Sequence, residues 1–271
     1  MSNALLPTYF LSHGGGPWPY MQGEFRQHFD QLEASLLATS QQLQPVPKAI
    51  LVVSGHWETA IWRVSAHAQP PMLYDFSGFP ENTYHAQYPA PGHPALAQQI
   101  VAMIQAGGMA AETDAARGFD HGTYSLLQIM YPEANIPVVQ LSVRQDFDAA
   151  AHLALGALLA PLRAQGVLII GSGLSYHNLR AFGAVGKLPS QQFDAWLQET
   201  LLTNDTAQRM RALTHWQTAP AARQAHPRED HLLPLMVALG AAAQETGHCI
   251  FHQADFMGDL TVSSFQFGEL D

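Results

Sequence analysis

The chain has 271 residues and a formal net charge of −10, since 22 aspartates and glutamates outnumber 12 lysines and arginines. A surface this acidic repels nucleic-acid phosphates and anionic lipid, so we expect neither as a partner and favour small-molecule ligands. The longest apolar run, Leu232–Ala243, is well short of the roughly 20 residues that span a bilayer, which argues against a membrane segment.

The cysteine content and the N-terminal residues both bear on the compartment. The single cysteine, Cys249, excludes an internal disulfide and a thiolate zinc site, which suits a reducing compartment. No lysine or arginine precedes Arg26, so the basic region of a secretory signal is missing. These features predict a cytoplasmic protein.

Strand candidates and amphipathic segments alternate along the chain. Short β-branched or apolar runs predict strands at 7–11, 49–53, 61–65, 136–143, 167–170 and 261–267. Helical spacing of apolar residues predicts helices at about 24–40, 94–107, 148–165, 190–203 and 231–246. For the last helix we expect Asp230 at the N-cap and Gly247 just past the end. The alternation predicts one α/β domain over residues 1–271, with a central, mostly parallel sheet flanked by helices on both faces.

Histidines follow the ends of several predicted strands. His13 follows the first strand, His56 follows the second, and His177 comes a few residues after the fifth. Because parallel strands end at one edge of a sheet, where ligands bind, these three side chains are expected to face one crevice. His231 stands at the start of the last predicted helix and His121 in a predicted loop, so both can reach in from a loop.

Two further features lie outside this group. His226 either caps the following segment or hydrogen-bonds a substrate. The segment 73–92 is rich in aromatic residues and in proline, so it predicts either a wall and lid for a planar ring or ordinary packing over the core.

Six motifs spread over nearly the whole chain give the sequence a family resemblance. They are Ser-His-Gly-Gly-Gly-Pro at 12–17, Ser-Gly-His-Trp-Glu at 54–58, Tyr-Asp-Phe-Ser-Gly-Phe-Pro at 74–80 with Tyr-Pro-Ala-Pro-Gly at 88–92, Phe-Asp-His-Gly-Thr-Tyr at 119–124, Gly-Ser-Gly-Leu-Ser-Tyr-His-Asn-Leu at 171–179, and His-Pro-Arg-Glu-Asp-His-Leu-Leu-Pro at 226–234. With these motifs the chain resembles the class III extradiol ring-cleavage dioxygenases, in particular the single-chain branch related to DOPA 4,5-dioxygenase.

The resemblance implies a mononuclear non-haem iron(II) site that zinc often occupies in isolated protein. It places the metal ligands at His13, His56 and His231, and it gives acid/base roles to His177 and His121. His177 is also a candidate fourth ligand in a zinc form. The implied partners are a small aromatic diol and O2.

The third ligand departs from the wider superfamily, in which two histidines are joined by a carboxylate. The matching position here is His231, and Glu58, Glu229 and Asp230 are nearby acids that could take its role. Three neutral imidazoles would leave the full charge of the ion in the site, which would acidify a bound catechol. Loss of the second catechol proton then needs a group with a pKa near the working pH, and His177 is of that type.

Other functions remain open at this point. Three histidines and a water also make a zinc hydrolase site, although His-Glu-x-x-His is missing. A serine esterase lacks its Gly-x-Ser-x-Gly motif, since Ser172 has no outer glycines. A non-catalytic metal-binding relative is the third alternative. The sequence leaves the oligomeric state and the particular catechol open, and Arg180 or Arg228 could attract a substrate carboxylate.

Overall fold

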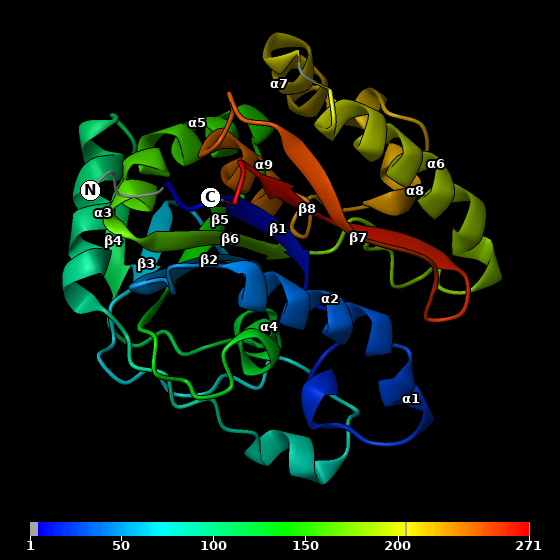
Figure 1. Ribbon diagram of the computed structural model, residues 1–271, viewed down its shortest axis with the longest axis horizontal. Coiled ribbons are helices and arrows are strands. Elements are labelled where there is room, and N and C mark those ends of the chain that lie inside the picture. The colour runs from blue at the N-terminus through cyan, green and yellow to red at the C-terminus, as the bar shows by residue number, and fades with distance from the viewer. Residues whose placement is uncertain (1–4, 204, 271) are drawn as a thin grey trace.

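The strands form one central sheet in the computed structural model, which describes residues 5–203 and 205–270 (Figure 1). Across the sheet the order is β4-β3-β5-β2-β6-β1-β8-β7. The strands are β1 Thr8–Ser12, β2 Ala49–Thr59, β3 Trp62–Ser65, β4 Ala111–Asp114, β5 Val138–Arg144, β6 Val167–Gly173, β7 Gly247–Phe256 and β8 Leu260–Phe267. The central strands β5, β2, β6 and β1 are parallel to one another, whereas β8 and β7 add an antiparallel hairpin at one edge. The predicted mostly parallel sheet is confirmed.

Helices cover both faces of the sheet (Figure 1). They are α1 Glu24–Gln27, α2 Asp30–Gln42, α3 Pro94–Ala106, α4 His121–Met130, α5 Ala149–Leu159, α6 Ala184–Leu201, α7 Thr206–Thr214, α8 Ala222–Ala225 and α9 Leu233–Gly240. In Figure 1, α2 and α4 lie below the sheet, and α5 and α9 lie above it. In the described parts of the chain, every helix is too short or too polar to cross a membrane.

The most buried strands and helix are also the most uniformly apolar. Residues 50–53 of β2 are apolar and fully buried, as expected for a parallel strand covered on both faces. Every residue of α9 is buried, because this helix packs on β6 and β1 and is covered in turn by α5. Gly156 of α5 lets the two helices approach closely, since a Cβ there would lie 2.2 Å from the Val237 carbonyl oxygen.

The last predicted helix, 231–246, is wrong at both ends. The helix α9 covers only Leu233–Gly240, and Leu232 takes the N-cap position in place of Asp230. Gly247 begins β7 and does not end a helix. The carboxylate of Asp230 faces the imidazoles of its neighbour His231 and of the distant His177, and these contacts take the place of the expected capping bond.

Other boundaries differ from the predicted elements as well. The strand predicted at 49–53 continues as β2 to Thr59, and α4 begins at His121, where a loop was expected. The helix predicted at 24–40 is divided into α1 and α2, and the end of the one predicted at 148–165 is a 3-10 turn. The strands β4 and β7 were not predicted, because edge strands that are largely polar lack an alternating apolar pattern.

Candidate active site

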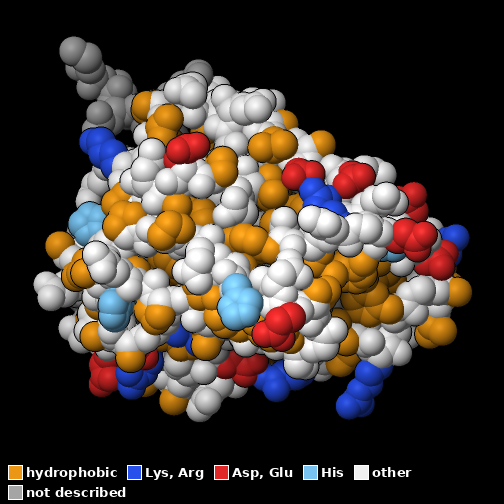
Figure 2. All heavy atoms as spheres, turned by 90° about the horizontal axis from the view of Figure 1, so that it is seen from below, with side chains coloured by type: hydrophobic (Ala, Val, Ile, Leu, Met, Phe, Trp, Pro, Cys, Tyr) orange, Lys and Arg blue, Asp and Glu red, His pale blue; other side chains and the backbone are white. Residues whose placement is uncertain are grey.

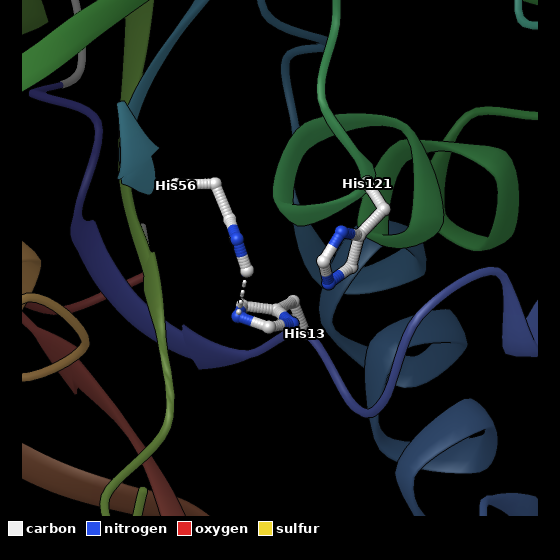
Figure 3. A group of neighbouring side chains, drawn as sticks. All are labelled: His13, His56 and His121. Carbon is white, nitrogen blue, oxygen red and sulfur yellow. Dashed lines mark hydrogen bonds between the residues drawn. The ribbon is translucent and has the colours of Figure 1, made fainter. Parts of the chain in front are cut away.

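Three imidazoles from distant parts of the chain meet at the carboxyl ends of the central strands. His13 directly follows β1, His56 lies in the last part of β2, and His231 lies two residues before α9. The Nε2 atom of His56 is 3.3 Å from that of His13 and 3.0 Å from that of His231. The ring centroids of His13 and His231 are 5.2 Å apart. Figure 3 shows His13 and His56 pointing toward each other, with His121 opposite them at the start of α4.

The end of β6 fixes the backbone of two of these histidines. The Gly173 carbonyl oxygen accepts a hydrogen bond of 3.1 Å from the His13 amide, and the Leu174 amide donates one of 3.2 Å to the His231 carbonyl oxygen. His56 is placed differently, because the register between β2 and β5 shifts between Ser54 and Glu58. Such an irregularity re-aims side chains at a strand end.

Gly55 allows the third segment to approach. A Cβ at this position would lie 2.9 Å from the Asp230 carbonyl oxygen and 3.3 Å from the His231 Cα. A larger residue would therefore push the segment before α9 away from β2. The glycine beside His56 is thus one reason why the rings of His56 and His231 can meet.

The donor set suits a single divalent ion. The His56 Nδ1 lies 3.3 Å from Asp75 Oδ2, and the His231 Nδ1 lies 2.5 Å from Asp230 Oδ2. Each Nδ1 faces a carboxylate, and with the ring proton on that nitrogen each Nε2 presents a lone pair. Two such lone pairs at 3.0 Å repel each other unless a cation lies between them, and nitrogens at about 2.1 Å from one ion are about 3.0–3.4 Å apart. The residues therefore fit an ion such as Fe(II) or Zn(II).

Burial keeps these three imidazoles neutral. It lowers the pKa of His13, of His56 and of His231 well below the usual value, and the neighbouring histidines lower each pKa further. Neutral imidazole is the form that binds a metal, so the site is ready for an ion at neutral pH without loss of protons.

Asp75 bridges two histidines, and the sequence patterns do not identify it as a site residue. Its Oδ1 lies 2.9 Å from the His121 Nδ1 and accepts from the His121 amide at 3.0 Å, while Oδ2 faces His56. Burial raises the pKa of Asp75, but the hydrogen bonds and charges of His121 and His56 outweigh burial and hold it at about 2. The motif at 74–80 contains this residue, but only the fold brings it beside the histidines.

The start of α4 fixes the position of His121. Asp120 is the N-cap, and its side chain accepts a bond of 3.1 Å from the Thr123 amide. The same carboxylate accepts from Ser54 in β2 and from Gln140 in β5, at 2.9 Å each. His121 is thereby anchored to β2, which carries His56, and to the neighbouring strand β5.

His177 stacks on His231. Their ring centroids are 3.4 Å apart with an interplanar angle of 17°, and the His177 Nδ1 is 3.8 Å from Asp230 Oδ2. Burial, with the charge of His121 in second place, lowers the pKa of His177 to about 4. The ring is neutral at neutral pH and presents a lone pair to the cavity, but its pKa lies below the near-neutral value expected for it from the sequence, because burial disfavours the charged form.

The acids near His231 divide into two kinds. Glu58 pairs with Arg228 at 2.6 Å, and Glu229 pairs with an arginine at 2.7 Å. Asp230 faces the Nδ1 atoms of two histidines, with the shorter distance to His231. Its geometry is that of a carboxylate that orients a ligand imidazole from behind.

His226 lies behind the site. It is fully buried, its Nε2 is 3.0 Å from the Ser175 carbonyl oxygen, and its ring packs against Phe193 and Trp216. It does not border the cavity formed by the described residues. The substrate contact suggested for His226 stays a prediction.

The histidines open into a cavity of about 430 Å³ with a largely apolar wall. Figure 2 shows a hollow on this face whose visible lining is mainly hydrophobic. Phe76 and Phe79 of the aromatic segment 73–92 border the cavity, and the Phe76 ring centroid is 6.0 Å from that of His121. This part of the segment forms a wall, the first of the two roles predicted for it.

Comparison with known proteins places the chain in a family. The family model described as catalytic LigB subunit of aromatic ring-opening dioxygenase matches residues 7–263. The chain belongs to this family. The family resemblance of the sequence motifs is thereby confirmed.

Individual relatives of this ring-opening dioxygenase cover almost its entire length. A Beta vulgaris protein named 4,5-DOPA dioxygenase extradiol is 42% identical over 265 residues, covering 96% of each chain. A Portulaca grandiflora protein of the same name is 38% identical over 268 residues, covering 96% of this chain and 95% of its own. The crystal structure of uncharacterized protein JW3007 from Escherichia coli K12 superposes with a TM-score of 0.78 at 32% identity, covering 97% of this chain and 99% of that one. The similarity therefore extends over almost the whole chain, and the matched residues 7–263 include the five histidines of the site.

Proposed function

We propose that this ring-opening dioxygenase is a metal-dependent extradiol enzyme that inserts O2 into a catechol-type ring, DOPA-like or related, next to the two hydroxyls. The observation that carries the proposal is that the Nε2 atom of His56 lies 3.3 Å from that of His13 and 3.0 Å from that of His231, in the lining of a cavity of ring-binding size. The family and the names of the relatives support the same chemistry.

His13, His56 and His231 hold the metal in this proposal, with Fe(II) as the active ion and Zn(II) as an ion that isolated protein can carry. A bound divalent ion supplies positive charge that acidifies the catechol hydroxyls and a centre at which the diol and O2 meet. Asp75 and Asp230 orient two of the ligand rings through Nδ1, which leaves each Nε2 aimed at one point.

His177 and His121 handle protons. His177 is neutral, borders the cavity and lies against His231, so its ring accepts a proton from a substrate hydroxyl and returns it to an oxygen of the product. Asp75 holds His121 through Nδ1, and the other edge of that ring hydrogen-bonds substrate oxygen. Phe76 and Phe79 confine the planar ring and keep water from the reacting carbons.

Anaerobic reconstitution tests the proposal. Chelator-treated protein is loaded with Fe(II), with Zn(II) or with no metal, and then receives air and a panel of catechols that includes DOPA, protocatechuate and caffeate. We expect the iron form to consume O2 and to give a yellow ring-opened product. Failure of every catechol to drive O2 uptake, or hydrolysis of an ester by the zinc form without O2, would contradict the proposal and favour the hydrolase alternative.

The location of the protein is a smaller part of the proposal. We place it in the cytoplasm, since a half-buried free thiol at Cys249 and no disulfide suit a reducing compartment. Fractionation of cells that express the tagged chain checks this, and recovery from an oxidising compartment would contradict it.

A further inference from the structure

The wall of the active-site cavity is apolar wherever it leaves the histidines. Beyond the five histidines and Asp75, it is made mainly of glycines and apolar side chains. Seven of the apolar side chains in the lining, here called the outer wall, are Phe25, Phe79, Leu179, Phe182, Phe256, Met257 and Leu260. None of the described residues that border the cavity is a lysine or an arginine.

Aromatic rings of the wall form a row that begins at His121. Phe76 lies 6.0 Å from His121 between ring centroids, Phe79 lies 5.3 Å from Phe76, and Phe25 lies 6.2 Å from Phe79. The rings therefore lead away from the histidines toward the outer wall. A catechol with its hydroxyls among the histidines would direct its substituent along this wall.

The cations around the cavity are engaged elsewhere. The pairs are Arg26 with Asp30 at 2.8 Å and with Glu33, Lys187 with Asp259 at 3.4 Å, and Arg228 with Glu58 at 2.6 Å. Each of these three cations therefore already faces a carboxylate. Arg180 and Arg228 border an adjoining groove of about 330 Å³ that shares His177 and Leu179 with the cavity.

The size of the cavity indicates a large substituent. A dry apolar cavity of about 150 Å³ holds one benzene molecule. The volume here, about 430 Å³, leaves room for a second group of similar size after the catechol ring, an ion and O2 are placed.

From this lining we propose, on the basis of the proposed function, that among the related catechols the preferred substrate carries, in place of the amino-acid side chain of DOPA, an uncharged, apolar substituent about as large as a second ring. Phe182 and Met257 are specificity-determining residues in the outer wall. An ionised carboxylate on the substituent would lie against apolar side chains and lose part of its hydration, with no cationic partner among the residues that border the cavity, which is less favourable than apolar contact. Arg180 and Arg228, the candidates for such a partner, do not border the cavity.

Matched substrates test this inference. The iron-loaded protein is assayed by O2 uptake with 4-propylcatechol and with 3-(3,4-dihydroxyphenyl)propanoate, which differ mainly in the carboxylate, and with 4-benzylcatechol and DOPA. We expect kcat/KM for the propyl compound to exceed that for the propanoate at least ten-fold, and the benzyl compound to be a better substrate than DOPA. Anaerobic calorimetry should give the same order in Kd.

The outcomes distinguish failure of the proposed function from failure of the substrate inference alone. If no catechol is consumed, the proposed function fails. If catechols are consumed but the propanoate equals or surpasses the propyl compound, only the substrate inference fails. In that case, loss of the propanoate turnover in Arg180→Gln would assign the carboxylate to the neighbouring groove.

Variants with a new positive charge test the wall directly. Phe182→Arg and Met257→Arg should each lower the propyl-to-propanoate ratio at least ten-fold, because each supplies the missing partner. Leu188→Arg is the control, since Leu188 is 61% exposed on α6 and does not border the cavity. An unchanged ratio in both wall variants, with folding verified by circular dichroism, would overturn the assignment of these two residues.

Discussion

Asp75 and Asp230 each face two imidazoles, so two carboxylates hold four of the five histidines of the cavity. Asp75 lies between His56 and His121, and Asp230 lies beside His231 and His177. Carboxylates behind ligand histidines fix the tautomer and the ring direction. At the scale of single residues, the proposed function therefore assigns metal binding and proton transfer to different members of one cluster.

Asp75→Asn tests the orientation of the rings. An amide cannot accept from both Nδ1–H groups as a carboxylate does, so we expect affinity for Zn(II) to fall about 10–100-fold. Competition with a coloured chelator measures the affinity. Glu112→Gln is the control, because Glu112 lies on the exposed edge strand β4. Equal affinity in wild type and Asp75→Asn would show that the aspartate does not support the metal site.

His177→Gln separates proton transfer from metal binding. We expect turnover of a catechol to fall about 100-fold or more, with metal content still near one ion per chain, because general acid–base catalysis contributes roughly 10²–10⁴. Metal analysis and O2 uptake are measured on the same sample, with His85→Gln as an exposed control. Loss of the ion together with activity would identify His177 as a ligand.

At the scale of elements, His152 links α5 to β5 and predicts a pH dependence of stability. Its Nε2 accepts from the Arg144 amide at 3.1 Å, and its Nδ1 donates to the Asp148 carbonyl oxygen at 2.6 Å. Burial lowers the pKa of His152 to about 4. The unfolded chain, with a histidine pKa near 6.5, therefore binds more protons between about pH 6.5 and 4, and stability rises with pH across that window.

The variant His152→Gln isolates this contribution. The wild type should lose about 2 kcal/mol more unfolding free energy than the variant between pH 7 and pH 5. Urea denaturation at the two pH values gives the difference of differences, which removes the contributions of other buried histidines. Parallel pH profiles for the two proteins would refute the role of His152.

The contact between α5 and α9 predicts a packing effect. Gly156→Ala places a methyl group 2.2 Å from the Val237 carbonyl oxygen, so α9 has to shift. We expect a loss of unfolding free energy of at least about 1 kcal/mol, because overpacking outweighs the better helix propensity of alanine. Ala157→Ser, on the exposed face of α5, is the control and should change stability by less than about 0.5 kcal/mol. Equal stability of both variants would show that the helices tolerate separation.

At the scale of the whole molecule, the site ties three distant segments together. His13, His56 and His231 come from β1, β2 and the approach to α9, and an ion bound to all three joins them. A divalent ion at 100 times its Kd should add about 2.7 kcal/mol of stability, or about 5 °C in Tm. Thermal scans of chelator-treated protein with and without Zn(II) measure the shift. Its persistence in His231→Ala would place the ion elsewhere.

Local patterns sufficed for much of the architecture and for the residues of the cluster. Apolar runs identified most of the central strands, and the positions of His13 and His177 after strand ends indicated their common crevice. The patterns failed where tertiary contacts decide structure. Asp230 has the sequence signature of an N-cap but faces the distant His177 as well as His231, and the strand β7 is formed by pairing with β8.

The sequence alone determined the alternation of strands and helices, because strands buried on two faces need apolar runs whatever their partners are. It also determined the acidic charge through its composition and the family of the chain through its motifs. Only the tertiary structure decided that Asp75 bridges His56 and His121, that His177 stacks on His231, and that the cavity wall has no cation among its described residues. These properties depend on distances between side chains far apart in the chain, which residue order does not contain.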